Sequence, residues 1–270
     1  YSDHLRRRPW TVETVNQLNL ERSLAIYRER FASASGSVFF FVGNLDMPAM
    51  ESLATRYLAS LPASPARETW KDLGIRPVKG RVEKTVRKGL DPKSRAALYF
   101  TGDLEWVFPE RYRLKSMQTV LDIRLREKIR EEISGTYGVG VSSSADRYPV
   151  TSYQVRISFG CAPEQVEKLI LAVNAEIELL KTKPVDDIYL TKVKQIQLRE
   201  REVALETNEF WMNMIEQCVW NGDDPRQIIL DFPKHVEALT KDDIQNAARK
   251  YLGTENVATF ILKPEADAAK

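Results

Sequence analysis

The sequence has 270 residues, of which 43% are hydrophobic and 29% charged, and its formal net charge is +2 at pH 7. This balance is typical of a protein that can bury a substantial core, and so small a charge argues against nucleic acid or a membrane surface as partner. The longest apolar run, at 38–42, is far too short for a membrane span. Because the chain opens with Tyr-Ser-Asp and shows no signal peptide, we expect it to be a piece of a longer chain.

The N-terminal part of the chain predicts helices around one short strand. Capping residues and apolar periodicity predict helices over 11–18, 20–31 and 48–61. The apolar run at 37–42 is typical of a buried strand. The proline-containing stretch 62–78 is expected to be a surface connection.

The middle of the chain predicts strands on both sides of a long helix. Strands are predicted over 82–88 and 95–101, and the helix over 109–133. An apolar stripe at helical spacing runs along that helix: Leu114, Met117, Leu121, Leu125 and Ile129. Alternating apolar and polar residues then predict a β-hairpin with strands over 137–144 and 152–159.

The C-terminal part is expected to be mostly helical. A helix begins near Pro163, Pro184 breaks it, and helix continues to about Tyr251 before a last strand over 256–262. Hairpins and long helices without strict β-α-β alternation predict an α+β fold, a largely antiparallel β-sheet with helices packed on one face. The whole chain, 1–270, is expected to form one domain of a multidomain protein.

An arginine and a tyrosine near the end of the long predicted helix could act together. Gly135 sits where a helix C-cap favours a residue with positive φ, and Arg130 lies in the last turn, where the helix dipole favours a cation. Tyr137 follows at the start of the next strand. Both side chains are donors suited to a carbonyl or an oxyanion. From these residues alone, a surface arginine and a half-buried strand tyrosine remain open alternatives.

The usual catalytic residue sets are absent from the sequence. The two histidines, His4 and His235, belong to no His-x-x-Glu-His motif or other two-ligand spacing, so no metal site is predicted in this chain. No Gly-x-Ser-x-Gly elbow is present, and Cys161 and Cys218 are expected to be buried free thiols. Three tryptophans are expected to pack in the core rather than line a cleft: Trp106, Trp211 and Trp220.

A basic stretch follows the surface connection: Lys79, Arg81, Lys84, Arg87, Lys88, Lys93 and Arg95. Such a run is expected to form one solvated strand face, and a polyanion site is the alternative. Because no aromatic residue interleaves before Tyr99, base stacking is poorly supported and no nucleic-acid partner is predicted.

The order of several features is similar to that of a known enzyme family. The run 39–46 resembles the family's strand, Gly-Asn turn, apolar residue and aspartate, before a helix that ends in Tyr-Leu-Ala-Ser-Leu-Pro at 57–62. The segment 130–137 resembles one in which an arginine and a tyrosine reach across a cavity. On these residues nearly the whole chain resembles the C-terminal module of the pitrilysin/insulysin-like M16 zinc peptidases, the inverzincin group that includes mitochondrial processing peptidase. Among its members, the large bacterial PqqL-like proteases are the most similar.

The resemblance implies a LuxS/mitochondrial processing peptidase-like metallohydrolase fold and a clamshell of two halves around one zinc. The zinc motif would lie in the N-terminal half, the expected partner of this chain, so zinc is implied for the full-length protein and no cofactor for this chain. It also implies catalytic roles for Tyr137 and Arg130 at the carbonyl or oxyanion of a peptide substrate. The expected substrate-binding residues are Gly138, Val139, Gly140 and Ser142. The stretch 139–143 could also add an edge strand to an extended peptide.

Two further expectations come from the same resemblance. The bacterial relatives suggest a periplasmic location. The alternative to an enzyme is a non-catalytic scaffold or core subunit, because the family also contains inactive partners. An inverted zinc motif upstream of Tyr1 would distinguish the enzyme from the scaffold.

Overall fold

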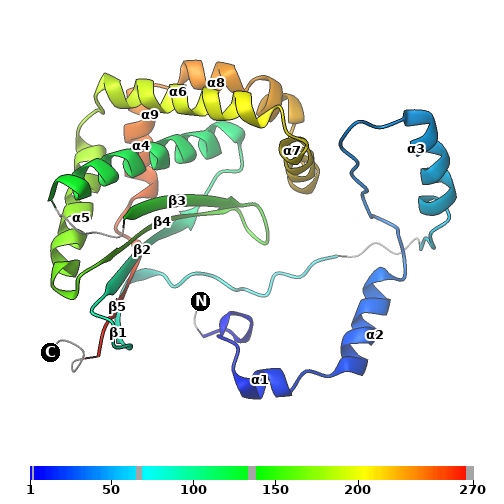
Figure 1. The fold of residues 1–270 in the computed structure, drawn as a ribbon, viewed down its shortest axis with the longest axis horizontal. Helices are drawn as coiled ribbons and strands as arrows, with labels where there is room; N and C mark the ends of the chain where they lie inside the picture. Colours follow the sequence, from blue (N-terminus) through cyan, green and yellow to red (C-terminus); the bar gives the residue numbers. More distant parts are fainter. Residues whose placement is uncertain (2, 65–68, 133–137, 266–270) are drawn as a thin grey trace. The chain divides into compact units, whose positions relative to one another are not determined.

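The structure of the chain is a computed structural model, shown in Figure 1. It describes residues 1, 3–64, 69–132 and 138–265, and the side chains of residues 130–132 lie outside this description. The chain divides into two compact units. Unit 1 consists of Tyr1–Arg76 with Leu205–Trp220, and unit 2 consists of Pro77–Ala204 with Asn221–Lys270.

Unit 1 is helical. Its helices are α1 (Val12–Asn16), α2 (Leu20–Phe31), α3 (Met47–Leu53) and α7 (Asn208–Asn221). A wider helical turn, Ala54–Leu58, continues α3, and a single turn lies at Leu5–Arg7. The start of α2 is set by Asn19, whose side chain accepts a hydrogen bond of 2.7 Å from the backbone N–H of Arg22. The predicted helices of this region are confirmed, and the described residues of 62–78 carry neither helix nor strand, as expected.

The predicted strand at 37–42 does not form in this structure. Within the described part of the chain these residues belong to no sheet, and Val38 and Phe41 are about half exposed, at 56% and 50%. The apolar side chains Tyr27 and Phe31 of α2 are also exposed, stacked on each other at 4.8 Å. A strand forms only where a neighbour pairs with its backbone N–H and C=O groups, so apolar residues alone were insufficient.

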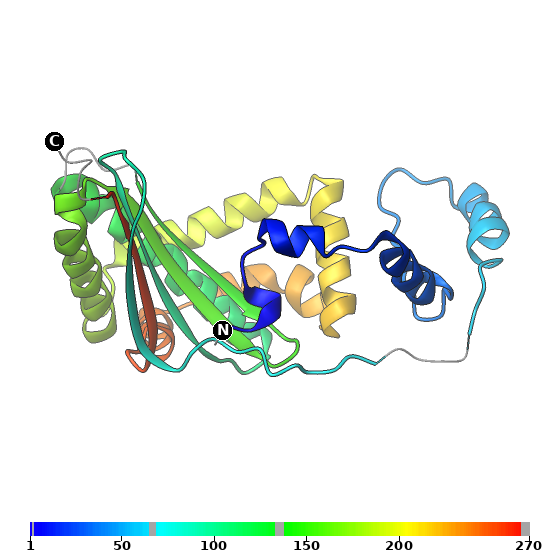
Figure 2. The same cartoon turned by 90° about the horizontal axis from the view of Figure 1, so that it is seen from below.

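Unit 2 is built on one five-stranded sheet. Its strands are β1 (Gly80–Arg87), β2 (Ser94–Asp103), β3 (Val139–Asp146), β4 (Ser152–Cys161) and β5 (Asn256–Lys263), in the spatial order β1-β5-β2-β4-β3. Only β1 and β5 run parallel, and the other neighbours are antiparallel. The hairpin of β3 and β4 is confirmed. Figure 2 shows that β5, the last strand in the sequence, lies between β1 and β2.

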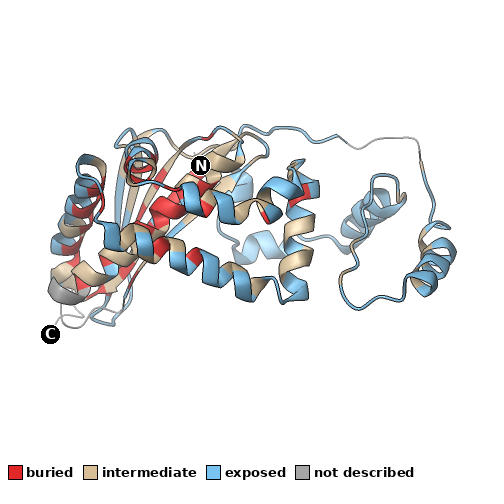
Figure 3. Ribbon diagram, turned by 90° about the horizontal axis from the view of Figure 1, so that it is seen from above, coloured by how far each residue is buried: buried red, intermediate tan, exposed pale blue. Residues whose placement is uncertain are grey.

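Helices cover one face of this sheet, which confirms the predicted α+β fold. The helices α4 (Phe108–Glu132), α5 (Val166–Thr182) and α9 (Lys241–Tyr251) contact the sheet and one another (Figure 1). Outside them lie α6 (Asp187–Ala204) and α8 (Phe232–Ala238), and short turns occupy Pro163–Gln165 and Arg226–Leu230. All five members of the predicted α4 stripe are buried, and Figure 3 shows buried residues along α4 and the strands beneath it.

The three tryptophans do not share one environment. Trp106 is half-buried against the core, where its indole Nε1 donates to Asp223 at 3.0 Å. Trp211 is also half-buried, and its Nε1 donates to the carbonyl of Leu205. Trp220 is 73% exposed, so the expectation of core packing is wrong for this residue. Helical spacing cannot show which side of α7 will be covered.

A network of charges joins α4 to α9. The carboxylate of Glu110 accepts hydrogen bonds from Arg113, Lys250 and the hydroxyl of Tyr251, the last at 2.6 Å. Arg113 also pairs with Asp243 at 2.9 Å. Burial by itself raises the pKa of Glu110, but the hydrogen bonds from Lys250, Tyr251 and Arg113 outweigh it and lower the pKa to about 2. This carboxylate therefore ties together two helices that cover the sheet.

We expect the network to make the stability of unit 2 sensitive to acid. Because the folded-state pKa of Glu110 lies below the usual value of 4.5, its contribution is complete above about pH 4.5 and is lost as the pH falls toward about 2. Because Glu110 keeps some contact with solvent, its pKa shift corresponds to a reduced effect on stability. We expect Glu110→Gln to lower the free energy of unfolding by about 1–3 kcal/mol at pH 7. Urea unfolding at pH 7, 4 and 2.5 would measure this.

The difference between the parent and Glu110→Gln should shrink as the pH falls. A matched control is Glu178→Gln, which removes an exposed carboxylate whose ion-pair partner among the described residues is Lys181, also on α5. A deficit of Glu110→Gln that is the same at all three pH values would contradict the role assigned to the charge of Glu110.

Candidate functional site

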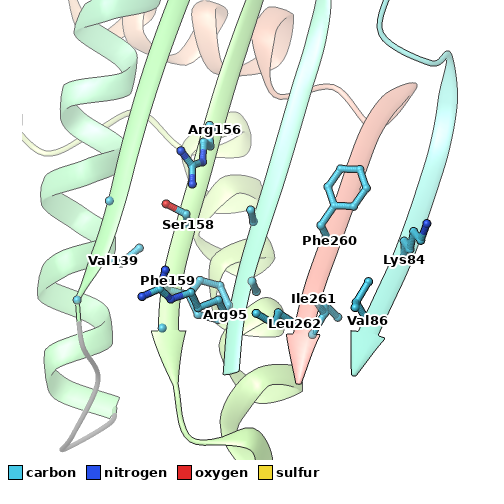
Figure 4. Close-up of a pocket in the computed structure, with 15 residues that line it drawn as sticks. Lys84, Val86, Arg95, Val139, Arg156, Ser158, Phe159, Phe260, Ile261 and Leu262 are labelled. Atoms are coloured by element: carbon cyan, nitrogen blue, oxygen red, sulfur yellow. The ribbon is translucent and has the colours of Figure 1, made fainter. Parts of the chain in front are cut away.

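The face of the sheet opposite the helices carries a groove. Strand alternation sends every second side chain of each strand to this open face. The register places these side chains in cross-strand rows, such as Lys84, Phe260, Ala97, Ser158 and Gly140. The groove has a volume of about 730 Å³ and reaches from β1 to Gly138 before β3. Figure 4 shows its lining along the strands.

Glycines form the end of the groove at β3. Gly138 has φ of +99°, a conformation that side-chain-bearing residues rarely adopt, so this position favours glycine. Apart from its chain neighbours, no described residue has an atom within 4 Å of a Cβ added at Gly138 or Gly140. Glycine has no side chain, and no described residue fills the space that a side chain would take. A ligand can therefore approach the backbone closely here. Ser142 lies on the same open face, opposite Arg156 in the register.

The groove combines cationic and apolar side chains. Arg95 and Arg156 are exposed, and the guanidinium of Arg156 lies 5.8 Å from the ring centroid of Tyr99. Tyr99 in turn meets Phe260 edge to face at 5.9 Å. Lys84 completes the charged set from β1, and no carboxylate appears among the lining residues. Such a surface suits a ligand with both anionic and apolar groups.

The basic stretch of the sequence does not form one face. Lys84 and Arg95 point to the open face, whereas Arg81 and Arg87 alternate to the other side of β1. The expectation of a single solvated face is therefore wrong. Arg156 and Phe260, which the sequence did not mark as site residues, complete the groove from distant parts of the chain. The alternation around Arg156, between the buried Val155 and Ile157, was the available signal.

The outer edge of β3 is partly closed by α4. The backbone N–H of Val141 donates to Asp122 Oδ1 at 2.8 Å, and Gln118 Nε2 donates to the carbonyl oxygen of Val141 at 2.8 Å. Both groups of Val141 are therefore taken, and such capping is a common protection of edge strands. An extended peptide that paired with this edge at Val141 would have to displace these side chains.

The predicted Arg130–Tyr137 pair lies at the margin of the described structure. Arg130 belongs to α4, but its side chain is not described, and Tyr137 lies outside the described residues. Of the predicted substrate-binding residues, Gly138 and Gly140 line the groove, and Ser142 lies on the same face. Val139 is buried on the helix side, at 7% exposed, so only its backbone can meet a ligand.

The described residues offer no set of metal ligands. Among them, no group of three or more histidine, cysteine, aspartate or glutamate side chains could hold an ion. His235 packs against Phe108 at 4.8 Å between ring centroids, and Cys161 and Cys218 are buried and not joined in a disulfide, as predicted. Burial raises the pKa of Cys161 to about 11, so this thiol is protonated at neutral pH and a poor nucleophile.

No helix in the described ranges is long and apolar enough to cross a membrane.

Most of the chain matches one known protein family. Residues 18–197, more than half of the chain, match the family described as the peptidase M16 inactive domain. The chain belongs to this M16 family. The term inactive fits the lack of a zinc motif that the two histidines already indicated.

The M16 domain is similar to named zinc proteases over a part of their length. A protein from Haemophilus influenzae named probable zinc protease PqqL is 24% identical over 258 residues, which cover 94% of this chain and 27% of that protein. The structure of the periplasmic protease PqqL from Escherichia coli matches 96% of this chain and 28% of its own, with 23% identity and a TM-score of 0.80. This chain thus spans about a quarter of these relatives.

A shorter structure shows the same fold. The peptidase M16 inactive domain from Pseudomonas fluorescens matches 94% of this chain and 60% of its own, with 19% identity and a TM-score of 0.70. The predicted M16 resemblance and its fold are therefore confirmed.

Proposed function

We propose that this M16 domain is the substrate-binding part of a zinc metallopeptidase that hydrolyses peptides or unfolded segments. The main support is the groove on the open face of the sheet, in a chain whose relatives are named zinc proteases. The groove crosses the sheet from β1 to Gly138, and its glycine end leaves room for a peptide backbone.

In this proposal Tyr137 and Arg130 act on the scissile peptide bond. When a peptide carbonyl is attacked, negative charge develops on its oxygen, and donors aimed at that oxygen lower the barrier. The phenol of Tyr137 donates to this oxygen, and Arg130 binds a neighbouring backbone carbonyl or orients the phenol. The adjacent Gly138 and Gly140, with Ser142, hold the substrate backbone on the open face.

Zinc belongs to another part of the protein in this proposal. The side chains described here do not fit it, since no three candidate ligands meet. The N-terminal half of the same polypeptide is the proposed partner and would hold the metal, which supplies an activated water. The E. coli relative is described as periplasmic, and we propose the same compartment for this protein.

The proposal is tested with a peptidase assay on the complete polypeptide and on this 270-residue chain, each with and without added zinc. We expect the complete polypeptide to cleave an unfolded protein such as casein only when zinc is bound, and the short chain to be inactive in both conditions. Cleavage by the short chain would contradict the proposal. An inactive complete polypeptide that carries stoichiometric zinc would favour the scaffold alternative.

A further inference from the structure

We infer that the groove on the open face is selective for acidic peptide segments, with Arg95 and Arg156 as its specificity-determining residues and Lys84 beside them. This inference rests on the proposed function, because it names the class of peptide that the groove takes. It depends on three features of the described residues: unpaired positive charge, an ordered guanidinium and an apolar strip.

The cations of the groove have no acidic partner in the described part of the chain. Lys84, Arg95 and Arg156 form no ion pair with any described residue, and no aspartate or glutamate lines the groove. Other arginines of unit 2 are paired, for example Arg111 with Asp223 and Arg124 with Glu176. Three like charges on one face repel one another. A ligand that brings carboxylates relieves this repulsion and therefore binds more tightly than a neutral ligand.

The guanidinium of Arg156 is held by an aromatic ring rather than by a carboxylate. It lies over Tyr99, which Phe260 supports from the side. A cation–π contact orients the guanidinium but leaves its N–H donors available, and the arginine fork matches a carboxylate with two hydrogen bonds. Figure 4 shows Arg156 and Ser158 on β4 and Arg95 beyond them on the neighbouring strand β2, so donors from two adjacent strands line the groove.

The spacing of the cations matches an extended chain. With about 4.8 Å between strands and about 3.3 Å per residue along them, the strand register puts the Cα atoms of the three cations about 12–16 Å apart. An extended peptide covers that distance in about four residues. Val86 and Leu262 at the β1 side supply the apolar strip for side chains between the acidic positions.

A peptide explains the groove better than a nucleic acid does. Base stacking needs a series of free aromatic faces, but the face of Tyr99 is covered by Arg156, and Phe260 is the one exposed aromatic ring among the described lining residues. The formal net charge of only +2 also provides little general attraction for a polyanion. The anionic ligand is therefore a peptide with carboxylates about four residues apart.

The test compares two labelled decapeptides, one with two glutamates four residues apart and one with glutamines in their place. Binding to the complete polypeptide is measured by fluorescence anisotropy, and cleavage as kcat/KM. We expect the acidic peptide to bind about five- to tenfold more tightly at 0.15 M salt, with the preference reduced at 0.5 M. The double variant Arg95→Gln/Arg156→Gln should abolish the preference, with the acidic peptide losing about five- to tenfold more affinity than the glutamine peptide.

The matched control is Arg81→Gln, which removes a positive charge from the other face of the same sheet. It should retain the preference. An acidic preference that persists in the double variant, or an equal loss for both peptides, would overturn the inference. So would heparin binding that depends on the two arginines while peptide binding does not. Because binding is measured apart from cleavage, an inactive protein with an intact acidic preference would count against the proposed peptidase function and not against the groove.

Discussion

Replacing Tyr137 with phenylalanine in the complete polypeptide is expected to lower kcat by about a hundredfold, while KM changes by no more than a few fold. The change removes one hydroxyl and keeps the ring, so it deletes a hydrogen bond that is strongest when charge develops on the carbonyl oxygen. Zinc content, measured by metal analysis, should be unchanged, because Tyr137 is not proposed as a ligand. Steady-state kinetics with a fluorogenic peptide would measure the effect.

A control variant tests whether the removal of a tyrosine hydroxyl elsewhere in the chain also lowers kcat. Tyr148 is 42% exposed in the connection between β3 and β4, and Tyr148→Phe should leave kcat within about twofold. Unaltered cleavage by Tyr137→Phe would refute the proposed donor. A raised KM with unchanged kcat would instead indicate that the hydroxyl binds substrate and transition state equally.

Replacing Leu121 with alanine is expected to lower the free energy of unfolding of unit 2 by about 2–5 kcal/mol. Leu121 is fully buried at the centre of α4, within the cluster that α4, α5, α9 and the sheet share. Its truncation removes apolar contacts and leaves a cavity that helices packed on both sides cannot close. Chemical denaturation followed by circular dichroism would report the loss.

The same substitution at an exposed leucine provides the comparison. Leu171 on α5 is 69% exposed, and Leu171→Ala should change the free energy of unfolding by no more than about 0.5 kcal/mol. Equal effects of the two substitutions would show that the cluster around Leu121 does not carry the stability of unit 2.

The helices of this protein could be predicted well because their signals are local. The α4 stripe repeats at helical spacing, and all its members are buried. Pro184 separates α5 from α6 as predicted, since proline disfavours helical geometry in the residue before it. The β3–β4 hairpin was also accessible, because its strands are adjacent in sequence and alternate clearly.

The groove could be predicted only in part. Gly138, Gly140 and Ser142 were expected at a substrate site, and they lie on the open face. Arg156 and Phe260 were missed as site residues because they join the groove through pairings between strands far apart in the sequence. The contacts of Asp122 and Gln118 with Val141 were missed for a similar reason, because α4 and β3 come together only in the tertiary structure.

The sequence by itself determined which segments are helical, which residues of α4 are buried, and that the chain has no histidine pair for zinc. Hydrophobic periodicity, capping and proline geometry act within a few residues, so they can be read along the chain. Only the tertiary structure decided that β5 enters the sheet between β1 and β2, which brings Phe260 and Arg95 into one groove. It also decided that 37–42 lies outside the sheet, because strand pairing depends on partners that no local pattern specifies.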